Sequence, residues 1–127
     1  MMGRYAFILF VTAVTLPNQS GAAELWNCTV ATEFPGKIVP TPRPARYTVE
    51  IANSEIVLAP LDGDILFTFA LQSNTPVEFI GKKQNASSLD KIHLDKVHRI
   101  LEVVTQRSDG TVGMRQHGSC VTNSGSP

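Results

Sequence analysis

The sequence contains little cysteine, little histidine and no excess of charge of either sign. Its two cysteines, Cys28 and Cys120, stand far apart in the chain, whereas a structural zinc site needs about four ligands, usually closely spaced. The 11 basic residues are balanced by 11 acidic ones, so there is no basic stripe to neutralise phosphates. These shortages argue against a structural zinc site and against nucleic-acid binding, and no cofactor is expected.

A recognisable catalytic motif is also missing. Nucleophilic catalysis needs a serine or cysteine beside a base, and no serine of this chain lies in a known nucleophile motif. The serines expected in loops are Ser54, Ser73, Ser87, Ser88 and Ser108. The sequence therefore favours a protein that is not an enzyme, and an enzyme of unrecognised type ranks third among the interpretations below.

The apolar run at the N-terminus is too short to anchor the chain in a membrane. It covers 5–16 and follows one positive charge, Arg4, whereas a spanning helix needs ~20 residues. Small residues up to Ala23 come next. This order is typical of a secretory signal peptide. We therefore predict that residues 1–23 are cleaved and that the mature chain, without a membrane span, is periplasmic or secreted.

Cys28 and Cys120 are expected to form a disulfide, because an even number of cysteines in an exported chain favours a bridge. Acylation of Cys28, as in a bacterial lipoprotein, is disfavoured, since Trp26 and Asn27 are too large for the positions before a modified cysteine. The bridge would join the first strand to the last. In the chain-entropy model, a loop of this length stabilises the fold by roughly 4–5 kcal/mol.

Much of the chain after residue 23 alternates between apolar and polar residues, which is typical of strands with one buried face. Trp26 and Cys28, for example, share a face. Turn signals such as Ser108-Asp109-Gly110 separate the segments at intervals of ~8–12 residues. The alternating segments are 25–30, 47–52, 55–59, 65–71, 77–80 and 111–117.

With a further hairpin over 89–106, the pattern predicts an all-β fold. We expect a small antiparallel β-barrel or sandwich of about seven to eight strands, closed by one disulfide. Residues 24–120 would form this single β-rich domain, and residues 121–127 a disordered tail.

Residues 88–105 are ambiguous, because their apolar residues also fall on one face of a helix. Valine and isoleucine are abundant there, which favours strands. In addition, Asp90, His93 and Lys96 would fall on the apolar face of such a helix. We therefore favour the hairpin and keep the helix as the alternative.

His93, Asp95 and His98 have side chains that ligate metals. On a strand, His93 and Asp95 share a face, but His98 lies past the turn. A solvated outer face is therefore expected here, and no metal site is predicted. The segment 62–64, Asp-Gly-Asp, has too few oxygen ligands at regular spacing for calcium and predicts a turn.

Two longer loops are the expected places for a binding function on a rigid β scaffold. One covers 35–46, where four prolines exclude a helix or a central strand. The other covers 81–90 and could meet an anionic or polar partner. Its candidate partner residues are Lys82, Lys83, Gln84 and Asn85.

The two ends of the chain resemble those of small periplasmic β-barrels of Gram-negative bacteria. An aromatic-x-Cys start, Trp26-Asn27-Cys28, and a cysteine near the end, Cys120, are similar in outline to the membrane-bound and periplasmic inhibitors of c-type lysozyme. The resemblance implies a small barrel that binds another extracytoplasmic protein. The leading interpretation is therefore a non-enzymatic protein-binding or inhibitor-like module.

The second interpretation is a small barrel that binds an apolar ligand. Phe67, Phe69 and Phe79 would line its interior. A chain this short more readily fills a barrel with its own side chains. An internal void lined by these phenylalanines would favour ligand binding, and a packed interior would disfavour it.

Overall fold

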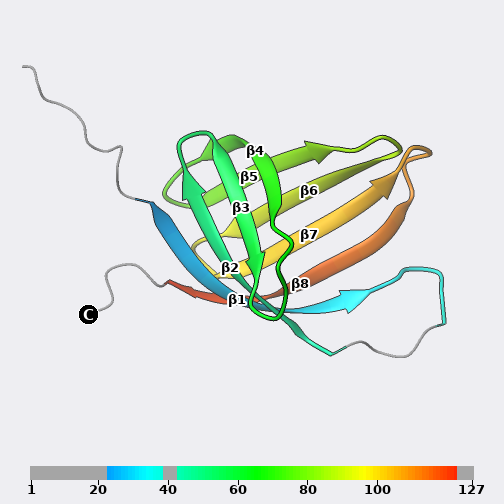
Figure 1. The fold of residues 1–127 in the computed structure, drawn as a ribbon, viewed down its shortest axis with the longest axis horizontal. Coiled ribbons are helices and arrows are strands. Elements are labelled where there is room, and N and C mark those ends of the chain that lie inside the picture. The colour runs from blue at the N-terminus through cyan, green and yellow to red at the C-terminus, as the bar shows by residue number, and fades with distance from the viewer. Residues whose placement is uncertain (1–22, 39–42, 123–127) are drawn as a thin grey trace, which may run out of the picture.

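The computed structural model describes residues 23–38 and 43–122. The regular secondary structure within these residues consists of β-strands alone. The strands are β1 (Glu24–Glu33), β2 (Ala45–Ala52), β3 (Glu55–Pro60), β4 (Phe67–Asn74), β5 (Glu78–Gln84), β6 (Ser88–Asp95), β7 (Ile100–Arg107) and β8 (Val112–Thr122). Figure 1 shows them following one another around a barrel in chain order. The predicted signal peptide lies outside the described residues except for Ala23. In the described part, no helix is long and apolar enough to cross a membrane.

The sheet closes on itself between its first and last strands. Each strand pairs antiparallel with the next, and β8 returns to pair with β1, which places the red strand beside the blue one in Figure 1. Cys28 lies directly opposite Cys120 in this pairing, and the two form a disulfide. The predicted all-β fold and its Cys28–Cys120 bridge are confirmed, and of the two expected architectures, barrel or sandwich, the structure is a closed barrel. Closure leaves the described sheet without a free edge.

The core forms because alternate residues of the strands face the interior of the barrel. On β1, for example, Trp26, Cys28 and Val30 are buried while Thr29 is exposed. The largest fully buried side chains are Phe79, Ile56, Leu58, Ile92, Leu94, Leu101, Val30 and Val49. Complete burial of each large apolar side chain is worth about 1.5–3 kcal/mol, so packing of the interior is a main source of stability.

Residues 88–105 form the favoured hairpin, and the helical alternative is wrong. β6 and β7 pair in continuous register from Ser88 opposite Arg107 to Asp95 opposite Ile100. Within this hairpin Ile92 and Leu101 are buried, whereas His93, between two buried neighbours, is not. Burial with a period of two residues is the pattern of a strand and not of a helix.

β4 begins two residues later than the alternation predicts. Ile65 continues the spacing of Phe67 and Phe69, but the strand starts at Phe67, which pairs with Leu58. The partner strand β3 ends at Pro60, which has no N–H to continue a ladder. Ile65 and the following residue therefore stay in the connection between β3 and β4, residues 61–66, called the β3–β4 loop below.

The segment 81–90 is not the polar loop that the sequence predicts. β5 continues to Gln84 and β6 begins at Ser88, so only residues 85–87 form the turn. Its polar residues belong mainly to the partly exposed ends of two paired strands. At the C-terminus, β8 extends to Thr122, past the start of the predicted tail, and residues 123–127 lie outside the described part of the chain.

The seam between β1 and β8 is very tight at Gly118. A Cβ added there would lie 2.6 Å from Val30 Cα and would overlap the carbonyl oxygen of Thr29. A glycine is needed at this point because the backbone of β1 occupies the space that any side chain would fill. The tight contact lies two residues before Cys120, so the bridge and the close approach strengthen the same seam.

A polar network covers Trp26 at the start of β1. The indole Nε1 donates a hydrogen bond to Glu24 Oε2 at 2.9 Å. Lys96 Nζ lies 3.1 Å from Glu24 Oε1 and 2.6 Å from Asn74 Oδ1, and only 12% of the Lys96 side chain is exposed. These contacts tie the end of β4 and the β6–β7 turn to the first strand.

Candidate functional site

The barrel interior is packed with the chain's own side chains. Phe69 and Phe79 are 2% and 0% exposed and belong to one continuous apolar cluster, against which the partly buried Phe67 packs. The buried polar group, Gln116, has partners, because its Nε2 donates to Tyr47 Oη and to Thr32 Oγ1, both at 3.1 Å. Of the predicted ligand-lining phenylalanines, Phe69 and Phe79 therefore belong to the packed core and Phe67 lies at its edge, an arrangement that disfavours an apolar ligand in the interior.

A depression of about 510 Å³ lies on the outer face of β5, β6, β7 and β8. We call it the cationic depression, because its lining includes Lys82, Lys91 and Arg115 and the single carboxylate of Glu102. Ile80, Val104 and Val112 add apolar surface. The charged residues alternate along their strands with buried ones, so they face outward.

The three cations of this depression lie in one row across the sheet. Lys82 on β5 is directly opposite Lys91 on β6, which is opposite Val104 on β7, which in turn is opposite Arg115 on β8. Within the described residues, no carboxylate forms an ion pair with Lys82 or Lys91. Like charges directly opposite each other destabilise a sheet, so the row is unfavourable in the free protein.

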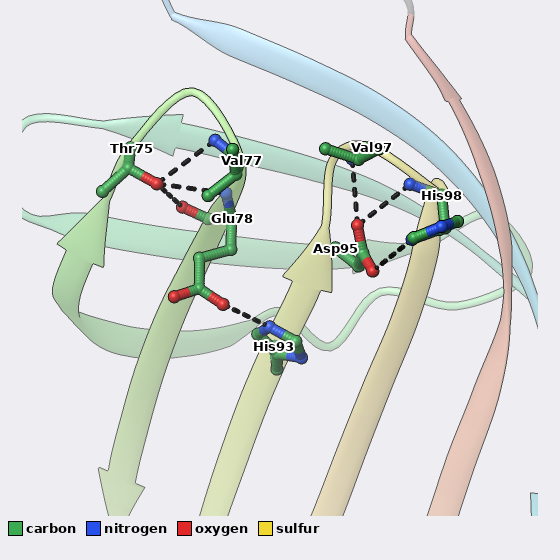
Figure 2. A network of polar contacts seen from close by, with 7 residues as sticks. All are labelled: Thr75, Val77, Glu78, His93, Asp95, Val97 and His98. Carbon is green, nitrogen blue, oxygen red and sulfur yellow. Dashed lines mark hydrogen bonds and ion pairs between the residues drawn. The ribbon is translucent and has the colours of Figure 1, made fainter.

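A second depression, of about 380 Å³, adjoins the first and shares His93, Glu102 and Arg115 with it. Arg115 Nε lies 3.3 Å from Glu102 Oε2. The same Nε is buried and has no hydrogen-bond partner, so the two groups attract by charge without an aligned hydrogen bond. His93 is occupied by another partner, since its Nε2 lies 2.8 Å from Glu78 Oε1 (Figure 2).

Asp95 organises the neighbouring β6–β7 turn (Figure 2). Its Oδ1 accepts hydrogen bonds from the backbone N–H groups of Val97 at 3.0 Å and His98 at 2.9 Å, and its Oδ2 lies 2.8 Å from His98 Nδ1. The hydrogen bond from the His98 backbone, followed by the contact with its ring, lowers the pKa of Asp95 below the ordinary value of 3.8. The turn is therefore built around an ionised carboxylate.

The β4–β5 turn lies beside it (Figure 2). Thr75 Oγ1 accepts hydrogen bonds from the backbone N–H groups of Val77 and Glu78, both at 3.2 Å. The two turns are joined by a backbone hydrogen bond of 2.9 Å from Lys96 N–H to the Val77 carbonyl. The side chains in this network are thus engaged in holding two turns, which is a structural role.

We expect Asp95→Asn to lower the melting temperature near pH 6 and the difference from the wild type to vanish near pH 2. A carboxyl group with a lowered pKa in the folded state stabilises the fold above its unfolded value of about 3.8, and this contribution is lost as the pH falls through the folded pKa. Hydrogen bonds from Thr111 also lower the pKa of Asp109. Because Asp109 is present in both proteins, its titration does not contribute to the difference between them. Thermal unfolding followed by circular dichroism across this range measures the effect. A difference that is independent of pH would contradict it.

The β3–β4 loop exposes large apolar side chains. Leu61, Ile65 and Leu66 are 54%, 70% and 59% exposed. The three residues lie within six positions of the chain, so their apolar surface is concentrated on one short segment. The start of the loop is fixed by a backbone hydrogen bond of 3.0 Å from Leu61 N–H to the Arg46 carbonyl. Asp62 Oδ1 lies 4.0 Å from Arg46 Nη2, and the Asp62 side chain is 81% exposed. The loop therefore presents apolar side chains beside the carboxylates of the Asp-Gly-Asp segment.

The four predicted partner residues have different places in the structure. Lys82 faces outward in the cationic depression, whereas Lys83 lies on the same face of β5 as the buried Phe79. Asn85 Nδ2 donates to Ser88 Oγ and Asp90 Oδ2, and the Gln84 side chain donates to two carbonyl oxygens of the turn. Gln84 and Asn85 therefore hold the turn together. Of the four residues, Lys82 lines the cationic depression, and Lys82, Lys83 and Gln84 also line a separate depression beside β3 and β4.

The three residues with metal-ligating side chains near the β6–β7 turn, His93, Asp95 and His98, do not come together in one metal site. His93 binds Glu78, and His98 binds Asp95. No cluster of three or more metal-ligating side chains occurs in the portion of the chain that the structure describes.

Two features are not evident from the sequence. The turn at 62–64 was predicted, but the extension of the β3–β4 loop to residue 66 was concealed because Ile65 has the spacing of the strand that follows. Lys91 and Arg115 are far from Lys82 in sequence, and only the strand register brings them into one row. A register derived from the paired hairpins would have placed Lys91 opposite Lys82.

No family model, no curated protein and no solved structure matches this chain.

Proposed function

We propose that this protein is an exported, non-enzymatic module that binds another extracytoplasmic protein through its β3–β4 loop. The observation that carries the proposal is the exposure of Leu61, Ile65 and Leu66 on one short loop. Clusters of large exposed apolar side chains on a soluble surface are typical of interaction sites.

The barrel provides a rigid support for this loop. One end of the loop follows Pro60, opposite Tyr47 in the sheet, and the other precedes Phe67, opposite Leu58. A loop held at both ends by a closed sheet loses little conformational entropy on binding, which favours affinity. A loop with exposed apolar side chains on a stiff barrel suits an inhibitor-like module that binds a cleft of its partner.

The charges of the β3–β4 loop indicate what kind of partner surface would complement it. Asp62 and Asp64 lie between the apolar residues, and Asp62 is 81% exposed. A complementary partner surface combines an apolar recess with basic groups at its rim. Export is supported by the leader-like pattern of residues 1–23 and by a disulfide, which persists in oxidising compartments.

The test compares the wild type with the double variant Ile65→Ser/Leu66→Ser. The purified protein is immobilised, exposed to the extracytoplasmic fraction of its source cells, and the retained proteins are identified and titrated. We expect the loop variant to bind its partner about tenfold more weakly or worse, because removing anchor side chains of an interface commonly has such an effect.

Val97→Ser is the matched control, since Val97 is 64% exposed but lies in the β6–β7 turn. It should retain the partner as the wild type does. Equal retention by the loop variant and the wild type would contradict the proposed role of the loop.

A further inference from the structure

We propose that the cationic depression is a second binding site, for an acidic segment of polypeptide with the pattern acidic-x-apolar-x-acidic. The site lies on β5–β8 and is independent of the β3–β4 loop. Three cations and one carboxylate line it, so its net charge is positive although the protein as a whole is neutral. The excess is confined to the depression, because Glu78 and Asp95 lie elsewhere on the same outer face and Glu33 lies opposite Arg115 on β1.

The unpaired lysines indicate an anionic ligand. Lys82 and Lys91 face each other directly across β5 and β6, and in the described residues neither has a carboxylate partner. Two like charges in opposite positions repel each other. A carboxylate placed between them relieves this repulsion and gains two charge-assisted hydrogen bonds.

Arg115 provides the second anion contact. Its Nε is buried near Glu102 without a hydrogen bond, and an unsatisfied buried donor is unfavourable. The side chain as a whole is 40% exposed, so the guanidinium is within reach of a ligand. A carboxylate of the ligand can bind the exposed part of the guanidinium in the planar bidentate manner that Glu102 does not provide.

The spacing of the row fits an extended peptide that crosses the strands. Adjacent strands are ~4.8 Å apart, so the midpoint of the two lysines lies ~7 Å from Val104, and Arg115 lies ~5 Å further on. Side chains on one face of an extended peptide recur every ~7 Å. Acidic side chains at the first and fifth positions therefore reach the lysines and Arg115, and the apolar side chain at the third lies over Val104.

The experiment uses the isotope-labelled protein and a synthetic peptide, acetyl-Gly-Glu-Ser-Val-Ser-Glu-Gly-amide, in an NMR titration. We expect amide shifts confined to the outer residues of β5–β8. Binding should weaken when NaCl is raised from about 0.1 M to about 1 M, which shortens the Debye length from ~10 Å to ~3 Å. The peptide with glutamine in place of both glutamates should not bind. Equal binding of that peptide, or shifts centred elsewhere, would overturn the proposal.

The variant Lys91→Glu shows whether Lys91 serves peptide binding or the stability of the sheet, because the two roles predict different results. It should weaken peptide binding at least tenfold, and it should raise the melting temperature by roughly 2–4 °C because Lys82 then faces an opposite charge. Lys37→Glu makes the same change of charge on an exposed residue of the β1–β2 connection and should leave binding within about twofold. If Lys91→Glu binds the peptide as the wild type does, the proposal fails.

The same set of experiments distinguishes the peptide from two other ligands of the cationic depression, a small anion and a second copy of this chain. Inorganic phosphate or citrate that displaces the peptide at equal concentration would identify a site for small anions and overturn the peptide assignment. Sedimentation that shows pairing of copies, abolished by Lys91→Glu, would assign the face to a second copy of this chain and overturn it as well.

Discussion

Removal of the Cys28–Cys120 disulfide should lower the free energy of unfolding by about 4–5 kcal/mol. The two cysteines are 92 residues apart in sequence, and the entropy that a bridge removes from the unfolded chain grows with the length of the closed loop. Domains of this size have about 5–15 kcal/mol of stability. The loss is therefore a large share of the total.

Urea unfolding of the wild type and of Cys28→Ala/Cys120→Ala measures this effect. A reducing agent added to the wild type should reproduce most of the loss, whereas it should leave the double variant unchanged. The variant also removes the sulfur atoms of two buried residues, Cys28 and Cys120, which are 2% and 3% exposed, so it is expected to be slightly less stable than the reduced wild type. An unchanged urea midpoint after verified reduction would refute the prediction.

Gly118→Ala should lower the stability by about 3 kcal/mol or more, because the new methyl group cannot be accommodated without moving the backbone of β1. The added Cβ overlaps the Thr29 carbonyl oxygen and lies 2.6 Å from Val30 Cα. These neighbours are main-chain atoms in a paired strand, so no change of rotamer can relieve the contact. The substitution should separate β1 from β8 locally.

Gly63→Ala is the matched control, since its Cβ would meet only Pro60, at 3.8 Å. It should leave the melting temperature nearly unchanged. Hydrogen exchange then locates the damage of Gly118→Ala, which should appear first at the amides of β1 and β8. A variant as stable as the control would show that the seam tolerates a side chain.

Much of the fold could be predicted because one physical signal, burial with a period of two, dominates the sequence. The alternation of Trp26, Cys28 and Val30 survives unchanged in the buried face of β1. The hairpin of β6 and β7 was favoured over a helix because Asp90 and His93 would otherwise lie on an apolar face. These predictions needed no knowledge of distant contacts.

The surface sites could not be predicted in the same way. Ile65 has the spacing of a strand residue, and its exposure depends on where β3 ends at Pro60 and leaves it without a partner. The row of Lys82, Lys91 and Arg115 depends on the register of three strand pairings. Alternation assigns a residue to a face, but it does not say which residues of other strands lie beside it.

The pairing of β1 with β8 has a consequence for how this chain folds. In the described part of the chain, every other strand pair joins neighbours in sequence, and such pairs form rapidly because their contacts are comparatively local. The last pairing must wait until both ends of the chain meet, so a nascent or truncated molecule without β8 has two open strand edges. Such edges recruit other chains, and the aggregation risk of this protein is therefore concentrated in the interval before its final strand arrives.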